Sequence, residues 1–219
     1  MDRYQRVLQL SDLSADKLSI LFDKKILIIG VGGVGQHVST YLATNGFKHI
    51  DIVDFDKVEI SNLNRQILLK EKDIGLLKVD VVKRELLARN CELVINAFNL
   101  KVDKDNITDL VKGYDLVVDA VDNWPSKLVI SEGCHQNHIP FIHIGVDGYK
   151  GQYCLFKEKS LKDILQDDVV NSPKDGVFGP VVGIVSSLAS LHIIKYFFDE
   201  IDTDTLYYYN EHSIRGIKI

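Results

Sequence analysis

The chain has 219 residues, of which 46% are apolar, so it is long enough to bury one substantial core. Its formal net charge is −5, with acidic and basic residues interspersed, which excludes a general nucleic-acid-binding surface. No run of about 18 apolar residues predicts a membrane-spanning helix, and the polar N-terminus lacks the apolar segment of a secretory signal. Neither nucleic acid nor a membrane is therefore expected as a partner.

Strands alternate with helices along most of the chain. Residues 2–22 are predicted to form two short amphipathic helices, the second capped by Ser14. Apolar runs predict strands at 25–29, 49–53, 93–98, 114–120, 141–145 and 152–156, with helices at 34–44, 78–90, 105–111, 126–137 and 181–198. A closing hairpin is predicted from residues 206–209 and 214–219.

This alternation predicts an α/β fold with a Rossmann-like, doubly wound, mostly parallel sheet and antiparallel C-terminal strands. We expect a single domain over residues 1–219. Residues 157–177 break the pattern and are predicted to form a long surface connection, called the crossover loop below, which is long enough to be functional.

A glycine-rich turn follows the first predicted strand. Gly30, Gly32, Gly33 and Gly35 lie between that strand and a helix. Glycines allow backbone N–H groups to approach phosphate oxygens, and the helix N-terminus adds a partial positive charge. Asp54 ends the second strand, where a carboxylate can accept hydrogen bonds from ribose hydroxyls. The turn predicts a nucleotide site and leaves ATP and NAD as alternatives.

The residues after Asp54 favour a triphosphate. They include side chains that a dinucleotide dehydrogenase does not need, namely Asn62, Arg65, Gln66 and, further on, Lys78. ATP and an attacking carboxylate are both anions, so cations must neutralise the phosphates before the carboxylate can approach. Arg65 offers a planar fork of donors for this purpose, and Lys78 offers a point charge.

Several motifs carry a resemblance to a known family. They are Arg3-Tyr4-Gln5-Arg6, Asp54-x-Asp56, Ser61-Asn62-Leu63-x-Arg65-Gln66, Asp73-Ile74-Gly75-x-x-Lys78 and Asp119-Ala120-x-Asp122-Asn123. In this order and spacing they resemble the ThiF/MoeB/HesA family, the bacterial and archaeal relatives of ubiquitin-activating enzymes. The resemblance extends from the first of these motifs to the last predicted strand.

The resemblance implies an enzyme that binds ATP and Mg²⁺. The Gly32–Gly35 turn would lie near the α-phosphate and the adenosine, and Asp54 would hold the ribose. The remaining nucleotide-site residues implied are Asp56, Asn62, Arg65, Gln66 and Lys78. A substrate carboxylate would attack the α-phosphorus to form an acyl-adenylate and release pyrophosphate, and no protein base is needed because carboxylates are ionised near neutral pH.

Two further roles follow from the resemblance. Asp122 would coordinate Mg²⁺, which prefers hard oxygen ligands. From their position directly after Asp122 and Asn123, and not from the resemblance, Trp124 and Pro125 are expected to shape the adenylate or substrate pocket. Arg6 would reach into the site of a partner subunit, which implies a homodimer. The alternative for Arg6 is a solvated charge on a frayed terminus.

The cysteines set this chain apart from most of the family. Many relatives hold a structural zinc on two Cys-x-x-Cys pairs, which are missing here, so no zinc is expected. Some relatives use a cysteine near the crossover loop to take the acyl group, but the nearest one here, Cys154, lies in an apolar strand and is expected to be inert. Cys91 and Cys134 are interpreted as packing residues. Three scattered cysteines also favour a reduced, cytoplasmic setting.

The substrate is left open between two classes. The first is the C-terminal glycine of a ubiquitin-like sulfur carrier of the ThiS/MoaD type. The alternative is a small-molecule or peptide carboxylate, as in the ThiF-like HcgE protein of guanylylpyridinol cofactor assembly or the microcin-type enzymes. The missing cysteines, the short length and a resemblance of residues 81–90 to the microcin-type enzymes favour the alternative, although no peptide-binding domain precedes Arg3.

Two other classes of protein are alternatives to an adenylating enzyme. An NAD(P)-binding oxidoreductase is disfavoured by the presence of Arg65, Lys78 and Asp122 together. A non-catalytic partner, like the inactive halves of eukaryotic activating heterodimers, would be expected to lack several phosphate-site residues.

Overall fold

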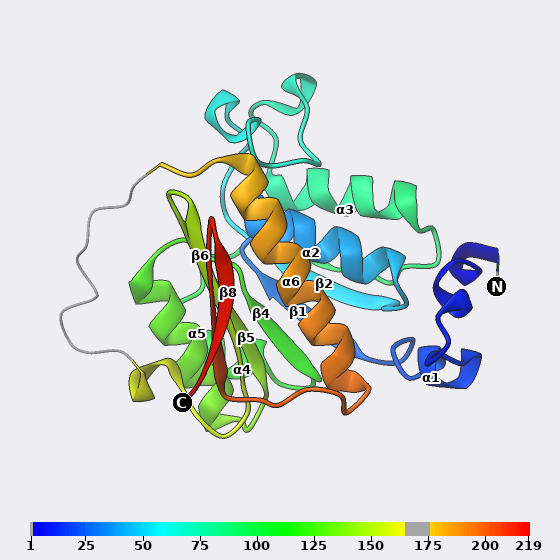
Figure 1. Cartoon of the computed structure of the whole chain (residues 1–219). Helices are drawn as coiled ribbons and strands as arrows, with labels where there is room; N and C mark the ends of the chain where they lie inside the picture. Colours follow the sequence, from blue (N-terminus) through cyan, green and yellow to red (C-terminus); the bar gives the residue numbers. More distant parts are fainter. Residues whose placement is uncertain (1, 165–175) are drawn as a thin grey trace.

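A computed structural model describes residues 2–164 and 176–219, and within them one sheet of eight strands runs in the order β3-β2-β1-β4-β5-β6-β7-β8 (Figure 1). The strands are β1 (Lys25–Ile29), β2 (His49–Val53), β3 (Ala97–Phe98), β4 (Leu116–Asp119), β5 (Phe141–Asp147), β6 (Lys150–Phe156), β7 (Thr205–Asn210) and β8 (Ser213–Lys218). Strands β1 to β5 pair in parallel, and β6, β7 and β8 are antiparallel additions. The predicted fold class, including its C-terminal hairpin, is confirmed.

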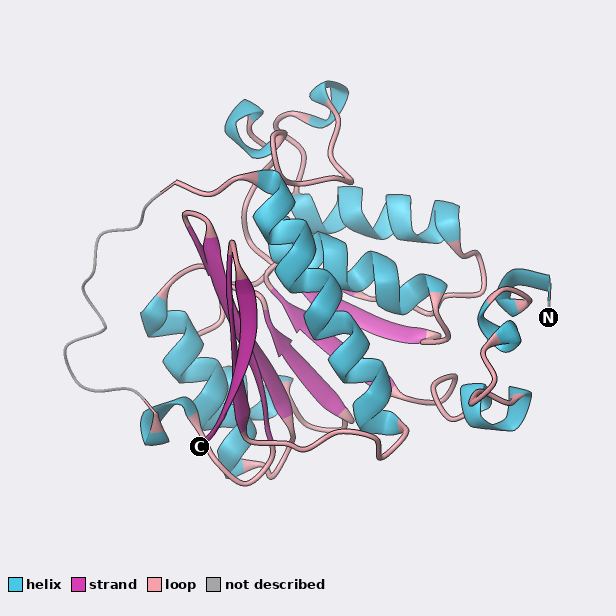
Figure 2. Ribbon diagram, viewed as in Figure 1, coloured by secondary structure: helices cyan, strands magenta, loops and turns pink. Residues whose placement is uncertain are grey.

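Helices cover both faces of this sheet (Figure 2). On one face lie α2 (Gly33–Thr44), α3 (Lys78–Arg89) and α6 (Gly179–Phe197), and on the other lie α4 (Ile107–Leu110) and α5 (Trp124–Gln136). Ile26 and Ile28 of β1 pack into the first layer, whereas Leu27 and Ile29 pack into the second. A continuous apolar strand is needed here because side chains alternate between two buried faces.

The N-terminal segment differs from the prediction. Only α1 (Ala15–Ser19) is an α-helix, and it begins as predicted, with the Ser14 hydroxyl accepting a hydrogen bond from the Lys17 N–H at 3.1 Å. Residues 2–4 and 7–9 form single 3₁₀ turns, η1 and η2, in place of the first predicted helix. Such a short segment gains too little from helical hydrogen bonds unless an apolar face is buried, and among residues 3–9 only Tyr4 is buried.

The strand predicted over 93–98 is shorter than expected. Only Ala97 and Phe98 pair as a strand, with one isolated bridge from Val94 to β2. The Asn96 N–H donates to the Asp51 carboxylate at 2.8 Å and so does not extend the backbone ladder. Of the crossover loop, residues 165–175 lie outside the described part, while Leu161–Asp163 form a 3₁₀ turn, η5. The two remaining 3₁₀ turns are η3 (Ile60–Asn62) and η4 (Glu71–Asp73).

Helix α6 is long and apolar enough, by length and composition alone, to cross a membrane. In this fold it packs against α2 and β6, and Val182, Val185 and Ala189 are buried in the core that results. It therefore serves as the core helix that the sequence predicted, although Ile184 and Leu191 stay exposed on its outer side.

A titratable group is enclosed where α6 meets the antiparallel strands. The His192 ring lies edge-on to Tyr153 and Tyr207, with centroid separations of 5.1 and 4.6 Å. Burial lowers the pKa of His192, because the imidazolium form loses water. The unfolded chain, with a histidine pKa of about 6.5, therefore binds a proton before the folded chain does, and stability falls as the pH drops below that value.

We expect His192→Phe to remove this acid sensitivity while keeping the aromatic packing. The Tm difference, variant minus wild type, should increase as the pH is lowered from about 8 to about 5.5. Thermal unfolding at each pH measures it. His212→Asn, at an exposed position in the β7–β8 turn, is the control and should track wild type. Parallel Tm curves for wild type and His192→Phe would contradict the prediction.

Candidate active site

The glycine turn joins the end of β1 to the start of α2 and is packed tightly. Gly30 has a φ of 91°, and a Cβ there would lie 2.8 Å from the Ala120 backbone, so the turn rests on the connection between β4 and α5. A Cβ on Gly35 would lie 2.0 Å from the Gly30 carbonyl oxygen. At Gly32, in contrast, the nearest atom would be 3.9 Å away. The N–H groups of the first turn of α2 have no helical acceptor and favour an anion.

Asp54 follows β2 and is fixed beside this turn. One carboxylate oxygen accepts the Val31 N–H and the other accepts the Asp56 N–H, both at 2.8 Å. Burial raises the pKa of Asp54, and these hydrogen bonds act in the opposite direction. The carboxylate predicted to bind ribose is therefore directly bonded to the glycine turn.

Lys78, the first residue of α3, forms an ion pair with Asp56. Its Nζ lies 2.8 Å from Asp56 Oδ2, and its backbone N–H donates to the Asp56 carbonyl oxygen at 3.0 Å. The lysine side chain is only 8% exposed, whereas the aspartate side chain is 49% exposed. The buried cation is thus compensated by an anion that solvent can reach.

Arg65 packs over the glycine turn from the segment that follows η3. A Cβ on Gly33 would lie 3.4 Å from Arg65 Cγ. The Arg65 Nη1 donates to the Ser61 carbonyl oxygen and to Asn64 Oδ1, both at 2.9 Å. The start of α6 packs against the segment that carries Arg65, since a Cβ on Gly179 would lie 2.7 Å from the Asn64 carbonyl oxygen.

Asn62 and Gln66 are buried in the same segment. Asn62 Oδ1 accepts the Glu59 N–H at 3.1 Å, and the Asn62 carbonyl oxygen accepts the N–H groups of Arg65 and Gln66. The side chain and the carbonyl group of Asn62 therefore support the loop that presents Arg65 at the glycine turn.

Gln36, which was not among the predicted site residues, connects that loop to the turn. Its Nε2 donates to the Val31 carbonyl oxygen at 2.9 Å and to Gln66 Oε1 at 3.2 Å. Its Oε1 accepts the Leu68 N–H at 2.9 Å, and the residue is 0% exposed. The local sequence gives no signal for Gln36, because other polar residues, among them His37 and Ser39, follow it in the same helix.

A second group missed in the sequence lies under the connection from β4 to α5. Asp119 is fully buried. Lys127 Nζ lies 3.2 and 3.1 Å from its two carboxylate oxygens, and His143 Nδ1 lies 2.9 Å from Oδ2. Burial by itself would raise the pKa of Asp119, but the Lys127 charge and the His143 hydrogen bond outweigh it and hold that pKa below its usual range. Lys127 also donates to the Ile144 carbonyl oxygen at 2.9 Å, which ties β4, β5 and α5 together.

Asp122 lies on the connection that this network anchors. It is exposed and directly precedes Asn123, whose side chain caps α5 by accepting the Ser126 N–H at 3.0 Å. Because Gly30 touches Ala120 and Val121, the connection adjoins the glycine turn. No group of three or more His, Cys, Asp or Glu side chains with metal-binding geometry occurs among the described residues. A single carboxylate fits Mg²⁺, whose other ligands are commonly waters and phosphate oxygens.

Arg6 is not part of this group within one chain. It is exposed, and its Nη1 donates to Gln9 Oε1 at 3.0 Å. The neighbouring Arg3 donates to the carbonyl oxygen of Arg89, at the end of α3 far from Lys78 (Figure 1).

The cysteines differ in exposure. Cys154 is buried on β6, and burial raises its pKa to about 12, so its thiolate is disfavoured. Cys134 is buried in α5, as expected of a packing residue. Cys91 is exposed, so its interpretation as a packing residue was wrong, because the chain has left α3 for a surface turn at that point.

Comparisons with known proteins agree on one family. The model of the ThiF family matches residues 4–218. A "Probable molybdopterin-synthase adenylyltransferase" of Gracilaria tenuistipitata var. liui is 34% identical over 200 residues, which cover 88% of this chain but 56% of that protein. The "Molybdopterin-synthase adenylyltransferase" of Salmonella typhimurium is 29% identical over 202 residues, covering 89% of this chain and 81% of that one. The crystal structure of E. coli MccB with ATP has a TM-score of 0.86 and 26% identity and covers 100% of this chain and 71% of that one.

Proposed function

Since the chain belongs to the ThiF family, we propose that it is an ATP-dependent adenylyltransferase, which activates a carboxylate as an acyl-adenylate and releases pyrophosphate. One observation carries this proposal. Arg65 packs on the glycine turn, the Lys78–Asp56 pair is linked to it through Asp54, and the connection bearing Asp122 adjoins it. An NAD(P)-binding oxidoreductase would not need these charges around its turn.

In the proposed reaction the protein acts by positioning and by neutralising charge. The first turn of α2 holds a phosphate through its N–H groups, and Asp54 holds the ribose. Arg65 and Lys78 face the phosphates and lower the repulsion that an incoming carboxylate meets. Asp122 would hold Mg²⁺, which supplies further positive charge at the phosphates when it is bound. The substrate carboxylate is already ionised, so no side chain has to remove a proton.

The proposed substrate is the C-terminal glycine of a ubiquitin-like sulfur-carrier protein. The names of the curated relatives, both molybdopterin-synthase adenylyltransferases, favour this class. A small-molecule or peptide carboxylate is the alternative, and the chain spans little more than half the length of the Gracilaria relative. We place the reaction in the cytoplasm, with no zinc required.

Carboxylate-dependent exchange of labelled pyrophosphate into ATP tests the reaction directly. Exchange should require Mg²⁺ and should appear with a carrier protein ending in Gly-Gly but not with the same protein lacking those two residues. Calorimetry with ATP·Mg and with NAD⁺ should show binding of the first only. Binding of NAD⁺ in place of ATP would refute the proposal, and exchange with small carboxylates alone would favour the alternative substrate.

Two glycines of the turn should separate binding from folding. Gly32→Ala meets no atom closer than 3.9 Å, so its Tm should match wild type, yet the methyl group would occupy the space proposed for a phosphate and weaken ATP affinity. Gly35→Ala would clash with the Gly30 carbonyl oxygen and lower the Tm. Calorimetry and thermal unfolding of both variants check this. Unchanged ATP affinity in Gly32→Ala would contradict a phosphate at this position.

We further propose a homodimer in which Arg6 acts in the partner subunit's site. The exposed Ile184 and Leu191 on α6 offer apolar surface for such contact. Arg6→Ala and Arg65→Ala should each be inactive alone, whereas a refolded mixture should recover roughly a quarter of wild-type exchange, because half of the dimers gain one intact site. A mixture as inactive as its components would exclude action across the interface.

A further inference from the structure

Two aromatic rings lie exposed at the edge of the candidate site. Tyr149 is in the turn between β5 and β6, and Phe178 immediately precedes α6. They are 53% and 59% exposed, yet their rings contact each other with centroids 5.5 Å apart and planes tilted by 38°. Single exposed apolar side chains are common on protein surfaces, whereas exposed aromatic side chains in contact with each other are typical of binding surfaces.

The two segments that carry these rings are fixed to each other. The Gly148 N–H donates to the Gly176 carbonyl oxygen at 2.9 Å, and Gly148 forms a bridge with Val177. Gly148 has a φ of 55°, which allows the tight turn that presents Tyr149. Backbone contacts therefore hold the two segments together, so the position of the ring pair does not depend on contact between the rings alone.

The same segment leads directly to Arg65. Gly179, next to Phe178, packs so closely on the Arg65 segment that a Cβ there would lie 2.7 Å from the Asn64 carbonyl oxygen and 3.6 Å from Arg65 Cα. The turn between β5 and β6 and the start of α6 lie at the same end of the sheet (Figure 1). A substrate that brings its carboxylate to Arg65 from this side would pass Tyr149 and Phe178.

We propose that Tyr149 and Phe178 bind the last residues of an extended peptide whose C-terminal carboxylate is the group activated. This inference rests on the proposed function and specifies how its substrate is recognised. Rigid aromatic side chains bind a flexible chain at low entropic cost and can stack on its peptide planes. A protein tail is favoured over a small molecule, because small ligands are commonly enclosed by concave pockets and these rings stand on an open edge.

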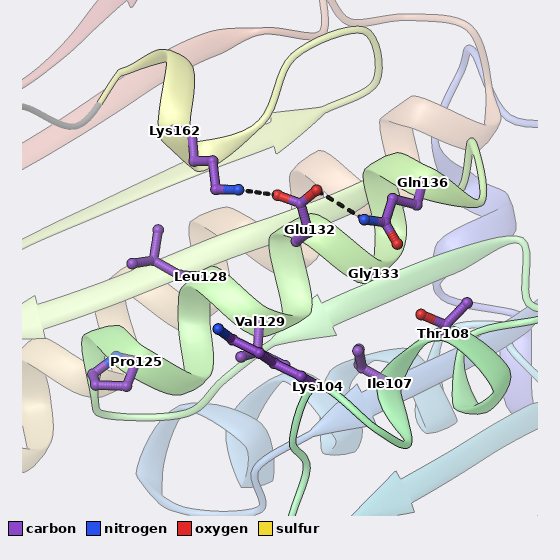
Figure 3. A pocket seen from close by; sticks show the side chains of 10 residues that line it. All are labelled: Lys104, Ile107, Thr108, Pro125, Leu128, Val129, Glu132, Gly133, Gln136 and Lys162. Atoms are coloured by element: carbon purple, nitrogen blue, oxygen red, sulfur yellow. Dashed lines mark hydrogen bonds and ion pairs between the residues drawn. The ribbon is translucent and has the colours of Figure 1, made fainter.

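A cavity of this fold lies away from the ring pair. A cavity of about 580 Å³ runs between α4 and α5, where Ile107, Leu128 and Val129 line it (Figure 3). Neither Tyr149 nor Phe178 contributes to it. Binding of a small carboxylate in that cavity would not depend on the ring pair. Removing the two rings should therefore weaken binding of a protein tail but not of such a small carboxylate.

The test is the double variant Tyr149→Ala/Phe178→Ala, assayed by pyrophosphate exchange with a ubiquitin-like carrier protein ending in Gly-Gly. We expect the KM for the carrier to rise at least about tenfold, with the KM for ATP and kcat near wild type. The conservative pair Tyr149→Phe/Phe178→Tyr should behave as wild type. The control pair Ile20→Ala/Val94→Ala removes exposed apolar side chains away from the ring pair and should also leave the KM unchanged.

Direct binding keeps this test separate from that of the reaction. Carrier binding is measured by calorimetry in the presence of a non-hydrolysable ATP analogue. If wild type binds the carrier and the alanine double variant does not, recognition of the carrier by the ring pair is supported, and absent exchange would then refute only the proposed reaction. An unchanged KM in the double variant, equal losses in the KM for ATP, or no carrier binding by wild type would each overturn the inference.

Discussion

Arg65→Ala is expected to lower carboxylate-dependent ATP–pyrophosphate exchange by at least about 100-fold, the loss typical of removing one preorganised donor to a developing charge. The fold should be unaffected, because among the described residues the guanidinium donates hydrogen bonds only to Ser61 and Asn64 of its own segment. Thermal unfolding should therefore give a Tm close to wild type. Calorimetry with ATP·Mg would show how much of the loss arises in nucleotide binding.

Matched variants define what Arg65 contributes. Arg65→Lys keeps the charge but loses the planar fork, so its exchange rate should fall between those of wild type and Arg65→Ala. Arg215→Ala, at an exposed position on β8, removes an arginine remote from the glycine turn and should retain full exchange. Asp122→Ala should abolish exchange with the fold intact. Wild-type exchange in Arg65→Ala would remove Arg65 from the proposed mechanism.

Lys127→Met is expected to cause the largest loss of stability, about 3–5 kcal/mol in the free energy of unfolding. The substitution keeps the apolar length of the side chain but leaves the buried Asp119 carboxylate without its cation. His143 could compensate only by binding a proton, which its burial opposes, since burial lowers the pKa of His143. Urea unfolding of wild type and variant measures the difference.

The unpaired charge can be separated from lost packing by a second substitution. Asp119→Asn in the Lys127→Met background removes the buried charge and should recover part of the lost stability. Lys112→Met breaks the exposed pair with Asp109 at 2.7 Å and should leave the unfolding curve essentially unchanged. Wild-type stability in Lys127→Met would show that Asp119 is compensated by other means.

The sequence was most informative where local pattern and tertiary environment agree. Lys25–Ile29 and His49–Val53 were predicted as strands with the observed bounds. In the first, a parallel strand buried on both faces requires continuous apolar residues. The glycine turn was predicted because only glycine fits where Gly30 and Gly35 meet backbone atoms. Family motifs, and not periodicity, indicated Arg65 and Asp122.

Residues whose role depends on distant partners could not be predicted. Gln36 bonds to Gln66, 30 positions away, and Lys127 bonds to Asp119 from a different element. Nothing in the local sequence around either residue distinguishes it from an ordinary polar side chain on a helix. Asn96 likewise left the predicted strand because the Asp51 side chain, 45 positions earlier, accepts its N–H. Side-chain hydrogen bonds across the fold decide these positions, and a single sequence does not reveal their geometry.

The ion pair between Lys78 and Asp56 has a consequence for the choice of nucleotide. Because the lysine already has an anionic partner, a phosphate that contacts it must either share the ammonium group with Asp56 or replace that carboxylate. Adenosine brings no charge with which to do either and would leave the pair closed. Lys78 would then favour nucleotides that carry phosphates over the uncharged nucleoside, by the difference between its contacts with phosphate and with Asp56.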